Sequence, residues 1–411
     1  MRLLIYEHVS GGGFADEAIS SSLLSEGFGM LRSLISDFKA SGHSVTTFLD
    51  SRIARLNPPI NADCVVPVFS SQEARANIRK ISESESADAA YVIAPETDGL
   101  LQSLVEFVEQ TGAASLNCQA RTVGKVSNKA FFYDFLKKLG INTPETLVFS
   151  VADDLEEIKK AIRGRLNFPL IFKPSNGVSC CGLSVVRNKD QVAGAVGKIK
   201  KESASTQFAV QEFIKGANAS VSLFSTGNNA VSVSLNQQDV TIEAPEGFSS
   251  YKGGLVPFDH PLRAEAFEVA EKIVKSFRDL RGYVGVDLVL TEEDAVAIEV
   301  NPRLTTSYVG LRRVANFNPA QAIVNAVLKR ELPTNTRSYG YAYFSKVMMP
   351  NPTVNALQKT YGMNKVVSPP FPVSENGVAW TLIASHGPTL EEGKLRFREA
   401  EKRILSIHKH R

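Results

Sequence analysis

The chain has 411 residues, which is too long for one ordinary hydrophobic core, so two or three domains are expected. Its 43% apolar and 22% charged residues are ordinary for a soluble globular protein. A net charge of +3 is too small to indicate nucleic acid or a membrane surface as a partner, and no apolar run approaches the length of a membrane span.

The N-terminus and the cysteines indicate the cellular compartment. Residues 1–13 turn polar too soon for a signal peptide and are expected to form a first buried strand. The cysteines Cys64, Cys118, Cys180 and Cys181 show neither metal-ligand spacing nor a disulfide framework. We therefore expect a cytoplasmic protein with reduced thiols.

Residues 1–120 alternate between strand-like and helix-like segments. This alternation predicts a parallel sheet with helices on both of its faces. The expected strands are 3–6, 45–49, 64–69, 89–94 and 115–118, and the expected helices are 24–41, 72–82 and 100–111.

Two loops of this first region could contact ligands. The turn Ser10 to Gly13 could hold an anion at a helix N-terminus, but it is not a clean dinucleotide fingerprint because Asp16 stands in place of the third glycine. Glu96 follows a strand at the edge where open sheets bind ligands. It is either a substrate contact or an acid at a helix start.

Two lysines in the next region lie beside features that could bind phosphate. Lys129 is in the first turn of a helix expected over 129–139, where a cation opposes the helix dipole. This conflict suggests an anion nearby, although an exposed lysine is the alternative. Lys173 ends a short strand before a Gly/Ser-rich loop at 174–182, whose small residues would let backbone N–H groups approach phosphate. A plain turn fits that loop equally well.

A predicted hairpin near position 290 carries the clearest chemical signal. Strands at 286–290 and 296–300 flank an acidic turn centred on Glu293, which puts Asp287 opposite Glu299. These two carboxylates and Asn301 would then project to one side, an oxygen set that suits Mg²⁺ or Mn²⁺. Polar residues facing water are the alternative. It explains less well why two acids should lie side by side, because directly paired like charges destabilise a sheet.

Taken in order, these features resemble the ATP-grasp superfamily. The matching order is an α/β region, a helix with a lysine, a lysine strand with a lid loop, the Q-E-F-I-x-G run at 211–216, and Asp287 followed by E-V-N-P-R at 299–303. The resemblance covers about residues 1–330. It implies an α/β and α+β protein of the ATP-grasp fold that uses ATP and Mg²⁺ and acts on a small-molecule carboxylate and an amine. Dimers are common in the superfamily, so a homodimer is compatible with the resemblance.

The resemblance also implies a division of the chain into four units. These are a Rossmann-like pre-ATP-grasp domain at 1–120, a central and lid subdomain at 121–205, a subdomain with the metal site at 206–332, and a small C-terminal extension containing β-structure at 333–411.

Residue roles follow from the matched positions. Lys129 and Lys173 would contact the nucleotide phosphates, and Arg303 would face the transferred phosphoryl group or acyl phosphate. Asp287, Glu299 and Asn301 would hold the metal. The lid would contain Gly177 and Gly182, and the adenine pocket would be lined by Gln211, Glu212, Phe213 and Ile214.

Asn218 departs from the family pattern. Many ATP-grasp enzymes carry a ribose-binding glutamate at this position. An amide can still hydrogen-bond a hydroxyl, but without the assistance of a charge.

Within the superfamily, the run N-P-R-L-T-T-S-Y at 301–308 is similar to the tyramine–glutamate ligase family of methanofuran biosynthesis. That similarity implies amide formation through an acyl phosphate. The alternatives are a ligase for another carboxylate and a nucleotide-binding module without turnover. Residues 237–260 are expected to form an irregular substrate loop. The positions that could contact substrate are Tyr251, Lys252, Tyr308, Arg312 and Arg313, and an ordinary surface or core role is the alternative for each.

Overall fold

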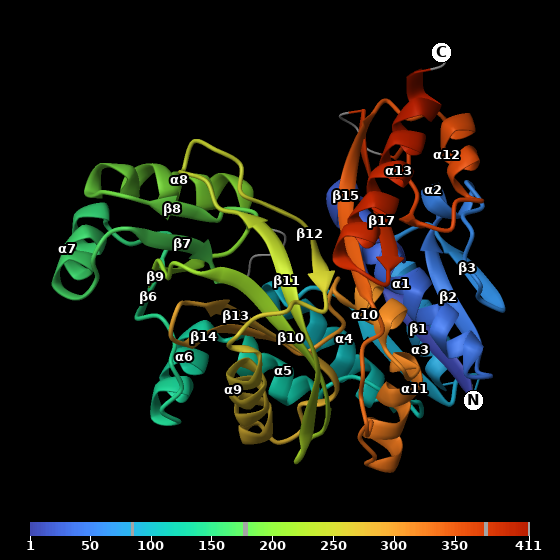
Figure 1. The fold of residues 1–411 in the computed structure, drawn as a ribbon, viewed down its shortest axis with the longest axis horizontal. Coiled ribbons are helices and arrows are strands. Elements are labelled where there is room, and N and C mark those ends of the chain that lie inside the picture. Colours follow the sequence, from blue (N-terminus) through green and yellow to red (C-terminus); the bar gives the residue numbers. More distant parts are fainter. Residues whose placement is uncertain (84–85, 176–179, 374–376, 410–411) are drawn as a thin grey trace.

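The structure, a computed structural model, describes residues 1–83, 86–175, 180–373 and 377–409. The described residues form three sheets with helices packed around them (Figure 1). Within the described residues, no helix combines the length and the apolar character that a membrane crossing requires. The four cysteines are free thiols.

The first sheet confirms the parallel arrangement predicted for the N-terminal region. Its five strands are ordered β3-β2-β1-β4-β5, and every pair is parallel. The strands are β1 (Arg2–Glu7), β2 (Ser44–Asp50), β3 (Cys64–Val68), β4 (Ala89–Ile93) and β5 (Ala114–Ser115). The helices of this region are α1 (Ser21–Ala40), α2 (Ser51–Ala54), α3 (Ser71–Glu83) and α4 (Leu100–Glu109).

The glycine turn after β1 does not form the anion site that we expected at a helix N-terminus. Helix α1 begins only at Ser21, and three of the four N–H groups of the turn donate to acceptors within the chain. The buried Glu7 carboxylate accepts from the N–H of Val9 at 3.0 Å and from the N–H of Ser10 at 2.7 Å. The Gly11 N–H donates to the Glu7 carbonyl at 2.8 Å. An internal carboxylate thus replaces the expected ligand.

The second sheet and its helices form the lid region. Its order is β6-β9-β7-β8, with all pairs antiparallel. Helices α7 and α8 share one hydrophobic core with this sheet and lie on its outer side (Figure 1). The elements are β6 (Thr146–Ser150), α7 (Leu155–Arg165), β7 (Leu170–Pro174), β8 (Ser184–Val186), α8 (Val192–Glu202) and β9 (Gln207–Glu212).

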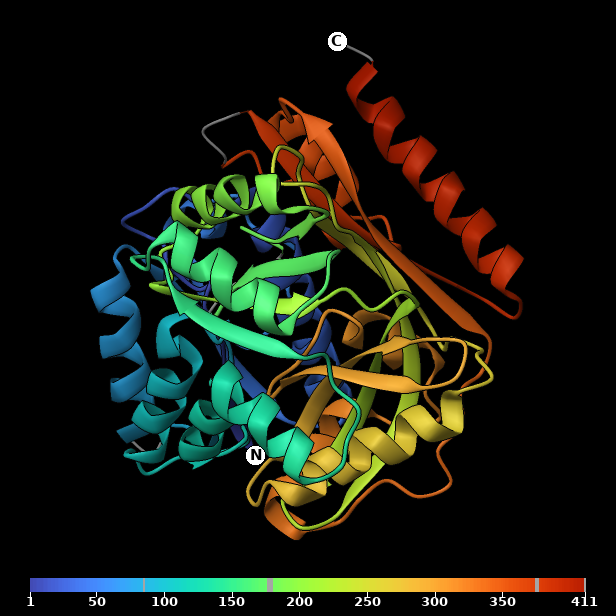
Figure 2. The ribbon, with the colours of Figure 1, turned by 90° about the vertical axis from the view of Figure 1, so that its left-hand side faces the viewer.

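The third sheet is antiparallel and joins the predicted metal hairpin to the C-terminal strands. Its order is β14-β13-β10-β11-β12-β15-β17-β16. Figure 2 shows the lid elements in front of the first sheet, and the last helix beside the C-terminal strands. The strands are β10 (Ala217–Thr226), β11 (Ala230–Thr241), β12 (Ser250–Val256), β13 (Arg281–Leu290), β14 (Ala295–Asn301), β15 (Tyr341–Pro350), β16 (Val366–Ser368) and β17 (Val378–Gly387).

The remaining helices surround this third sheet and its junction with the first. They are α5 (Ala120–Ser127), α6 (Lys129–Lys138), α9 (Arg263–Ser276), α10 (Tyr308–Val314), α11 (Pro319–Val324), α12 (Val354–Thr360) and α13 (Leu390–Lys409). Since the third sheet runs without interruption into residues 341–387, the C-terminal extension shares a sheet with the preceding unit. The division of the chain into four units stays a prediction.

The segment 237–260 is more regular than we expected. Half of it belongs to β11 and β12, which pair with each other, and β12 pairs with β15 on its other side. The turn between the two strands contacts the lid: the Glu243 carbonyl accepts from Val185 N–H at 2.9 Å, and Lys198 Nζ donates to the Gly247 carbonyl at 2.7 Å. The segment therefore links the lid to the large sheet.

Candidate active site

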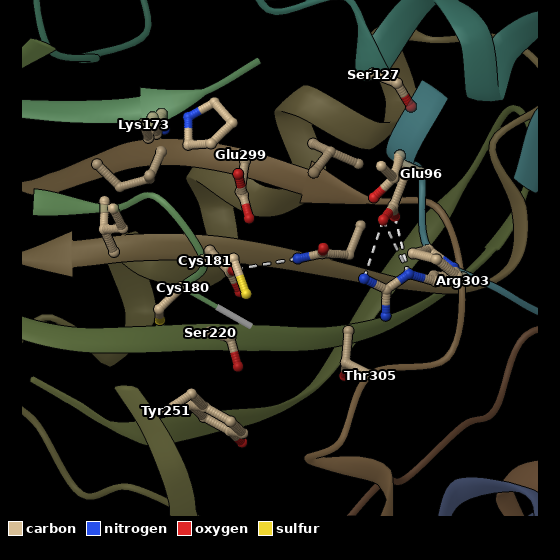
Figure 3. A pocket seen from close by; sticks show the side chains of 18 of the residues that line it. Glu96, Ser127, Lys173, Cys180, Cys181, Ser220, Tyr251, Glu299, Arg303 and Thr305 are labelled. Atoms are coloured by element: carbon tan, nitrogen blue, oxygen red, sulfur yellow. Dashed lines mark hydrogen bonds and ion pairs between the residues drawn. The ribbon is translucent and has the colours of Figure 1, made fainter. Parts of the chain in front are cut away.

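A cavity of about 910 Å³ lies where the three sheets approach one another. Loops after β1 and β4, helix α6, the lid strands β7 and β9, and the hairpin β13–β14 all contribute to its wall. Figure 3 shows its interior with Glu96 and Arg303 on one side and Lys173 near Glu299 on the other. Residues from distant parts of the chain are thus brought to one space.

The hairpin β13–β14 confirms the predicted pairing. Asp287 lies opposite Glu299, and Gly285 lies opposite Asn301. The Asn301 side-chain nitrogen donates to the Asp287 carboxylate at 3.1 Å. The three expected metal ligands therefore converge on one face, and all three line the cavity.

One irregularity in the hairpin makes this convergence possible. Next to the turn, Leu290 pairs with Ala295. In that register Asp287 would face Ile298, and Glu299 would point to the opposite face of the sheet. The register shifts by one residue after Asp287, so Ile298 becomes a β-bulge and Glu299 returns to the cavity side.

The two carboxylates differ in their electrostatic surroundings. Burial and the nearby Glu299 charge raise the pKa of Asp287, whose hydrogen-bond donors are the neutral amides of Gln238 and Asn301. The Lys129 ammonium, 2.9 Å away, lowers the pKa of Glu299. Only one of the two adjacent acids is therefore neutralised by a lysine.

A divalent cation fits this arrangement. The Asn301 nitrogen is engaged by Asp287, which leaves the amide oxygen as a third ligand beside the two carboxylates. The described residues contain no group of three or more His, Cys, Asp or Glu that could hold a metal, so this amide has to complete the set. Two carboxylates and an amide make a hard-oxygen site of the kind that Mg²⁺ occupies.

The two predicted phosphate lysines both line the cavity. Lys129 begins α6, where its ion pair with Glu299 supplies the anion that its position led us to expect. Burial is the largest single influence and acts to lower the pKa of Lys129, but the charge and hydrogen bond of Glu299, together with Tyr133 and Glu96, outweigh it and the pKa is raised. Lys173 Nζ donates to the Tyr133 hydroxyl at 3.0 Å and lies 5.6 Å from the centre of its ring. Phosphate contact stays a prediction for both.

The expected adenine and ribose contacts share one wall of the cavity. That wall contains Gln211, Glu212, Phe213, Ile214 and Asn218. The Gln211 side chain donates to the Thr146 hydroxyl at 2.8 Å, and Glu212 accepts from the Glu145 N–H at 3.1 Å. These bonds hold the strand in place, while nucleotide contact by the five residues stays a prediction.

The lid glycines are less informative. Gly177 lies outside the described residues. Gly182 has a φ of +69°, and a Cβ there would come within 2.8 Å of Pro174. Its N–H donates to Glu202 at 2.9 Å and it does not contribute to the cavity wall, so the described geometry supports a turn-forming role. Its contact with ATP stays a prediction.

Arg303 is held by a residue from the first sheet. Its Nε and Nη2 donate to the Glu96 carboxylate at 3.1 and 3.0 Å across 207 positions of the chain (Figure 3). Burial acts to lower the pKa of Arg303, but the three carboxylates Glu96, Glu299 and Asp287 together outweigh this effect and raise it. Glu96 therefore ties the N-terminal region to the end of β14, next to the predicted metal ligand Asn301.

A second buried ion pair was missed by the sequence analysis. Lys346 on β15 is paired with Glu26 on α1, which also accepts from the Thr306 hydroxyl at 3.0 Å. The ammonium lies 5.8 Å from the ring centre of Tyr251, and both Tyr251 and Glu26 line the cavity. A lysine inside the apolar run at 341–349 was the one available signal.

Several buried polar atoms at the cavity wall have no hydrogen-bond partner among the described residues. They are Thr97 Oγ1, Ser127 Oγ and Ser175 Oγ. Buried polar groups normally have partners, so their concentration here indicates a wall that is completed by ligand or water.

Four of the five residues proposed to contact substrate are placed elsewhere. Tyr251 lines the cavity, whereas Lys252, Tyr308, Arg312 and Arg313 do not, so that expectation is wrong for these four. The Tyr308 hydroxyl instead donates to Asp37 at 2.8 Å, because α10 turns away from the cavity toward α1.

Comparison with known proteins adds to this geometry. A family model of an ATP-grasp domain matches residues 126–307, and a model described as pre ATP-grasp 3 domain matches residues 43–123. The chain is 28% identical over 334 residues to a tyramine–L-glutamate ligase of Methanocaldococcus jannaschii, covering 80% of this chain and 90% of that protein.

Two solved structures extend the likeness. One is an L-amino acid ligase from Bacillus licheniformis, with a TM-score of 0.66 and 16% identity, covering 98% of this chain and 97% of that one. The other is the biotin carboxylase domain of a 2-oxoglutarate carboxylase from Hydrogenobacter thermophilus, in complex with MgADP and bicarbonate. Its TM-score is 0.70 at 14% identity, covering 97% and 89% of the two chains. At these identities the likeness concerns the fold alone.

Proposed function

This chain belongs to the ATP-grasp superfamily and carries a pre-ATP-grasp domain before its ATP-grasp domain, and from that premise we propose that it is an ATP- and Mg²⁺-dependent ligase that joins a carboxylate to an amine. Its relatives are ligases that form C–N bonds. The fold is the ATP-grasp fold predicted from the sequence.

One observation supports this proposal most directly. Asp287, Glu299 and Asn301 converge on a cavity whose wall also contains Lys129, Lys173 and Arg303. Three oxygen ligands beside three cations provide what phosphoryl transfer requires, namely a metal site next to fixed positive charges.

The metal would be held by Asp287, Glu299 and the Asn301 amide oxygen. When bound, Mg²⁺ would neutralise charge on the phosphates of ATP. Its binding would also remove the repulsion between two adjacent carboxylates, of which only Glu299 has a lysine partner.

The reaction that we propose has two steps. A substrate carboxylate oxygen attacks the γ-phosphorus of ATP, which forms an acyl phosphate and releases ADP. The amine then attacks the acyl carbon, and phosphate leaves as the amide forms. Lys129 and Lys173 would fix the phosphates, and Arg303, oriented by Glu96, would face the group in transfer. The lid would keep water from the acyl phosphate.

For the substrates, we propose a tyramine–glutamate type of reaction. The relative from M. jannaschii bears that name and aligns with most of the chain. The cavity wall also includes the apolar side chains of Phe14, Leu23 and Met30. Such a wall suits the body of an aromatic amine, while the charged part of the cavity suits an amino-acid carboxylate.

The test compares two acids of the same hairpin. ADP formation is followed with ATP, Mg²⁺, L-glutamate and tyramine, and then with other carboxylate and amine pairs. We expect Glu299→Ala to lower the rate at least about 100-fold, because a metal ligand is lost. Glu293→Ala, on the exposed turn, should keep wild-type activity.

The possible outcomes separate the parts of the proposal. Full turnover by Glu299→Ala would show that the metal assignment is wrong. Turnover with another pair, but not with tyramine and glutamate, would keep the ligase and overturn its substrates. No ADP formation with any pair would indicate a nucleotide-binding module.

A further inference from the structure

A second charged cluster lies outside the cavity, where α1, α10 and β16 meet. It contains Arg32 and Asp37 on α1 together with Arg312 and Arg313 in the last turn of α10. None of these four residues lines the cavity described above. The catalytic proposal therefore does not explain why three arginines are gathered here.

Asp37, the one carboxylate of this cluster, already has hydrogen-bond partners. Arg312 Nε lies 3.0 and 2.9 Å from the two Asp37 oxygens, and its Nη2 also donates to Asp37. The Tyr308 hydroxyl donates to the same carboxylate at 2.8 Å. Asp37 thus balances Arg312 and offers little to the other two guanidinium groups.

The other two arginines have no carboxylate partner among the described residues. Arg32 donates only to neutral acceptors, the carbonyls of Val366 at 2.9 Å and Val367 at 3.3 Å. The Nε of Arg313 is buried and has no hydrogen-bond partner in the described structure. Burial and the charges of Arg312 and Arg32 lower the pKa of Arg313 to about 10.

The helix dipole explains the position of Arg312 and Arg313 only in part. Basic residues in the last turn of a helix interact favourably with its dipole. That effect explains their place on α10, but it leaves a buried guanidinium N–H unpaired. A buried charged donor without a partner is costly, so a protein normally supplies one.

We propose that Arg313, together with Arg32, binds an oxyanion of the phosphate class at the junction of α1, α10 and β16, separately from the catalytic cavity. Two guanidinium groups without a carboxylate partner match the charge of a phosphate dianion. Their planar N–H forks also match its oxygen atoms. The ligand is inorganic phosphate or a phosphate monoester.

Such a ligand would act on elements that also shape the active site. Helix α1 carries Glu26 and Met30 in the cavity wall and Arg32 at the junction. Helix α10 begins five positions after Arg303. A phosphate bound between the two helices would brace them against each other and against β16.

The test uses the full-length protein and thermal unfolding. The melting temperature is measured at low salt and after addition of sodium phosphate, sodium chloride or sodium malonate at equal ionic strength. We expect phosphate to raise the wild-type value by at least about 2 °C beyond chloride. Arg313→Gln should lose this rise, whereas Arg396→Gln, an exposed arginine on α13, should retain it.

Two further measurements keep the proposal distinct from the active site and from a structural role. Glu299→Ala should keep the phosphate effect, since the junction lies outside the cavity. At low salt without phosphate, Arg313→Gln should melt at or above the wild type, because a repulsive charge is removed. Repeating the series with a phosphate monoester tells the two ligand sources apart.

Four results would overturn the proposal. They are no phosphate-specific rise in the wild type, an equal rise in Arg313→Gln, an equal or larger rise with malonate, and a lower melting temperature of Arg313→Gln in buffer alone.

Discussion

Two lysine–glutamate pairs border the cavity, and they differ in what surrounds them. Lys346 and Glu26 join β15 to α1, with side chains only 5% and 11% exposed. Lys129 and Glu299 join α6 to the metal hairpin, with side chains 16% and 35% exposed. The comparison suggests that the first pair mainly holds the molecule together and that the second mainly prepares the site for a ligand.

The largest effect that we expect concerns the more buried pair. Lys346→Met should leave Glu26 charged and unpaired, which costs about 3–5 kcal/mol of unfolding free energy for a buried pair. Chemical denaturation measures this loss. The double variant with Glu26→Gln should recover much of the stability, and a single variant as stable as wild type would contradict the structural role.

A smaller effect, of another kind, is expected at the second pair. Lys129→Met should lower the rate of ADP formation about 10- to 100-fold, because a phosphate contact is lost. The unfolding free energy should change by at most about 1 kcal/mol, because the Glu299 side chain is 35% exposed and solvent screens its charge. Steady-state kinetics and denaturation of the same sample measure both values. A large stability loss with unchanged kinetics would reverse the comparison.

The smallest effect concerns Asp287, the carboxylate without a lysine. Because its pKa is raised in the folded protein, the folded state holds a proton that the unfolded state loses between about pH 4 and neutrality. Without Mg²⁺, wild-type stability should therefore fall across this range relative to Asp287→Asn. Thermal unfolding with EDTA from pH 5 to 8 measures the difference.

Adding Mg²⁺ at pH 8 supplies the control for this last prediction. The wild type should then gain stability, and Asp287→Asn should gain less, because it lacks one carboxylate ligand. An equal gain in the two proteins would contradict the assignment of Asp287 to the metal.

The parts of the site that could be predicted from sequence are those within one hairpin or one helix end. Strand alternation and a turn centred on Glu293 predicted Asp287 opposite Glu299. The pairing is confirmed, but with the observed turn at 291–294 it requires the bulge at Ile298, which was not predicted. Lys129 was singled out because its charge conflicts with the start of α6. Local geometry determines such features, so a short stretch of sequence is sufficient to predict them.

The contacts that were missed join distant segments. Arg303 and Glu96 are 207 positions apart, and Lys346 and Glu26 are 320 apart. No periodicity within a short stretch of sequence predicts such a pair, because the packing of whole sheets decides which side chains meet. The glycine turn failed for a different, local reason: the buried Glu7 carboxylate accepts the Ser10 N–H, and the Gly11 and Gly13 N–H groups donate to the carbonyls of Glu7 and His8.

The bulge at Ile298 has a consequence for comparing related chains. The turn at 291–294 has an even number of residues. In a ladder without a bulge, such a turn pairs residues that are an odd number of positions apart, as it does for Leu290 and Ala295. Asp287 and Glu299 are an even distance apart, twelve positions, and only the additional residue reconciles the two counts. A relative with a regular ladder and the same turn should therefore space its two acids by eleven. Alignments of this superfamily should accordingly allow a one-residue gap in the strand that corresponds to β14. An alignment with a fixed spacing between the two acids would match Glu299 to the wrong residue of such a relative.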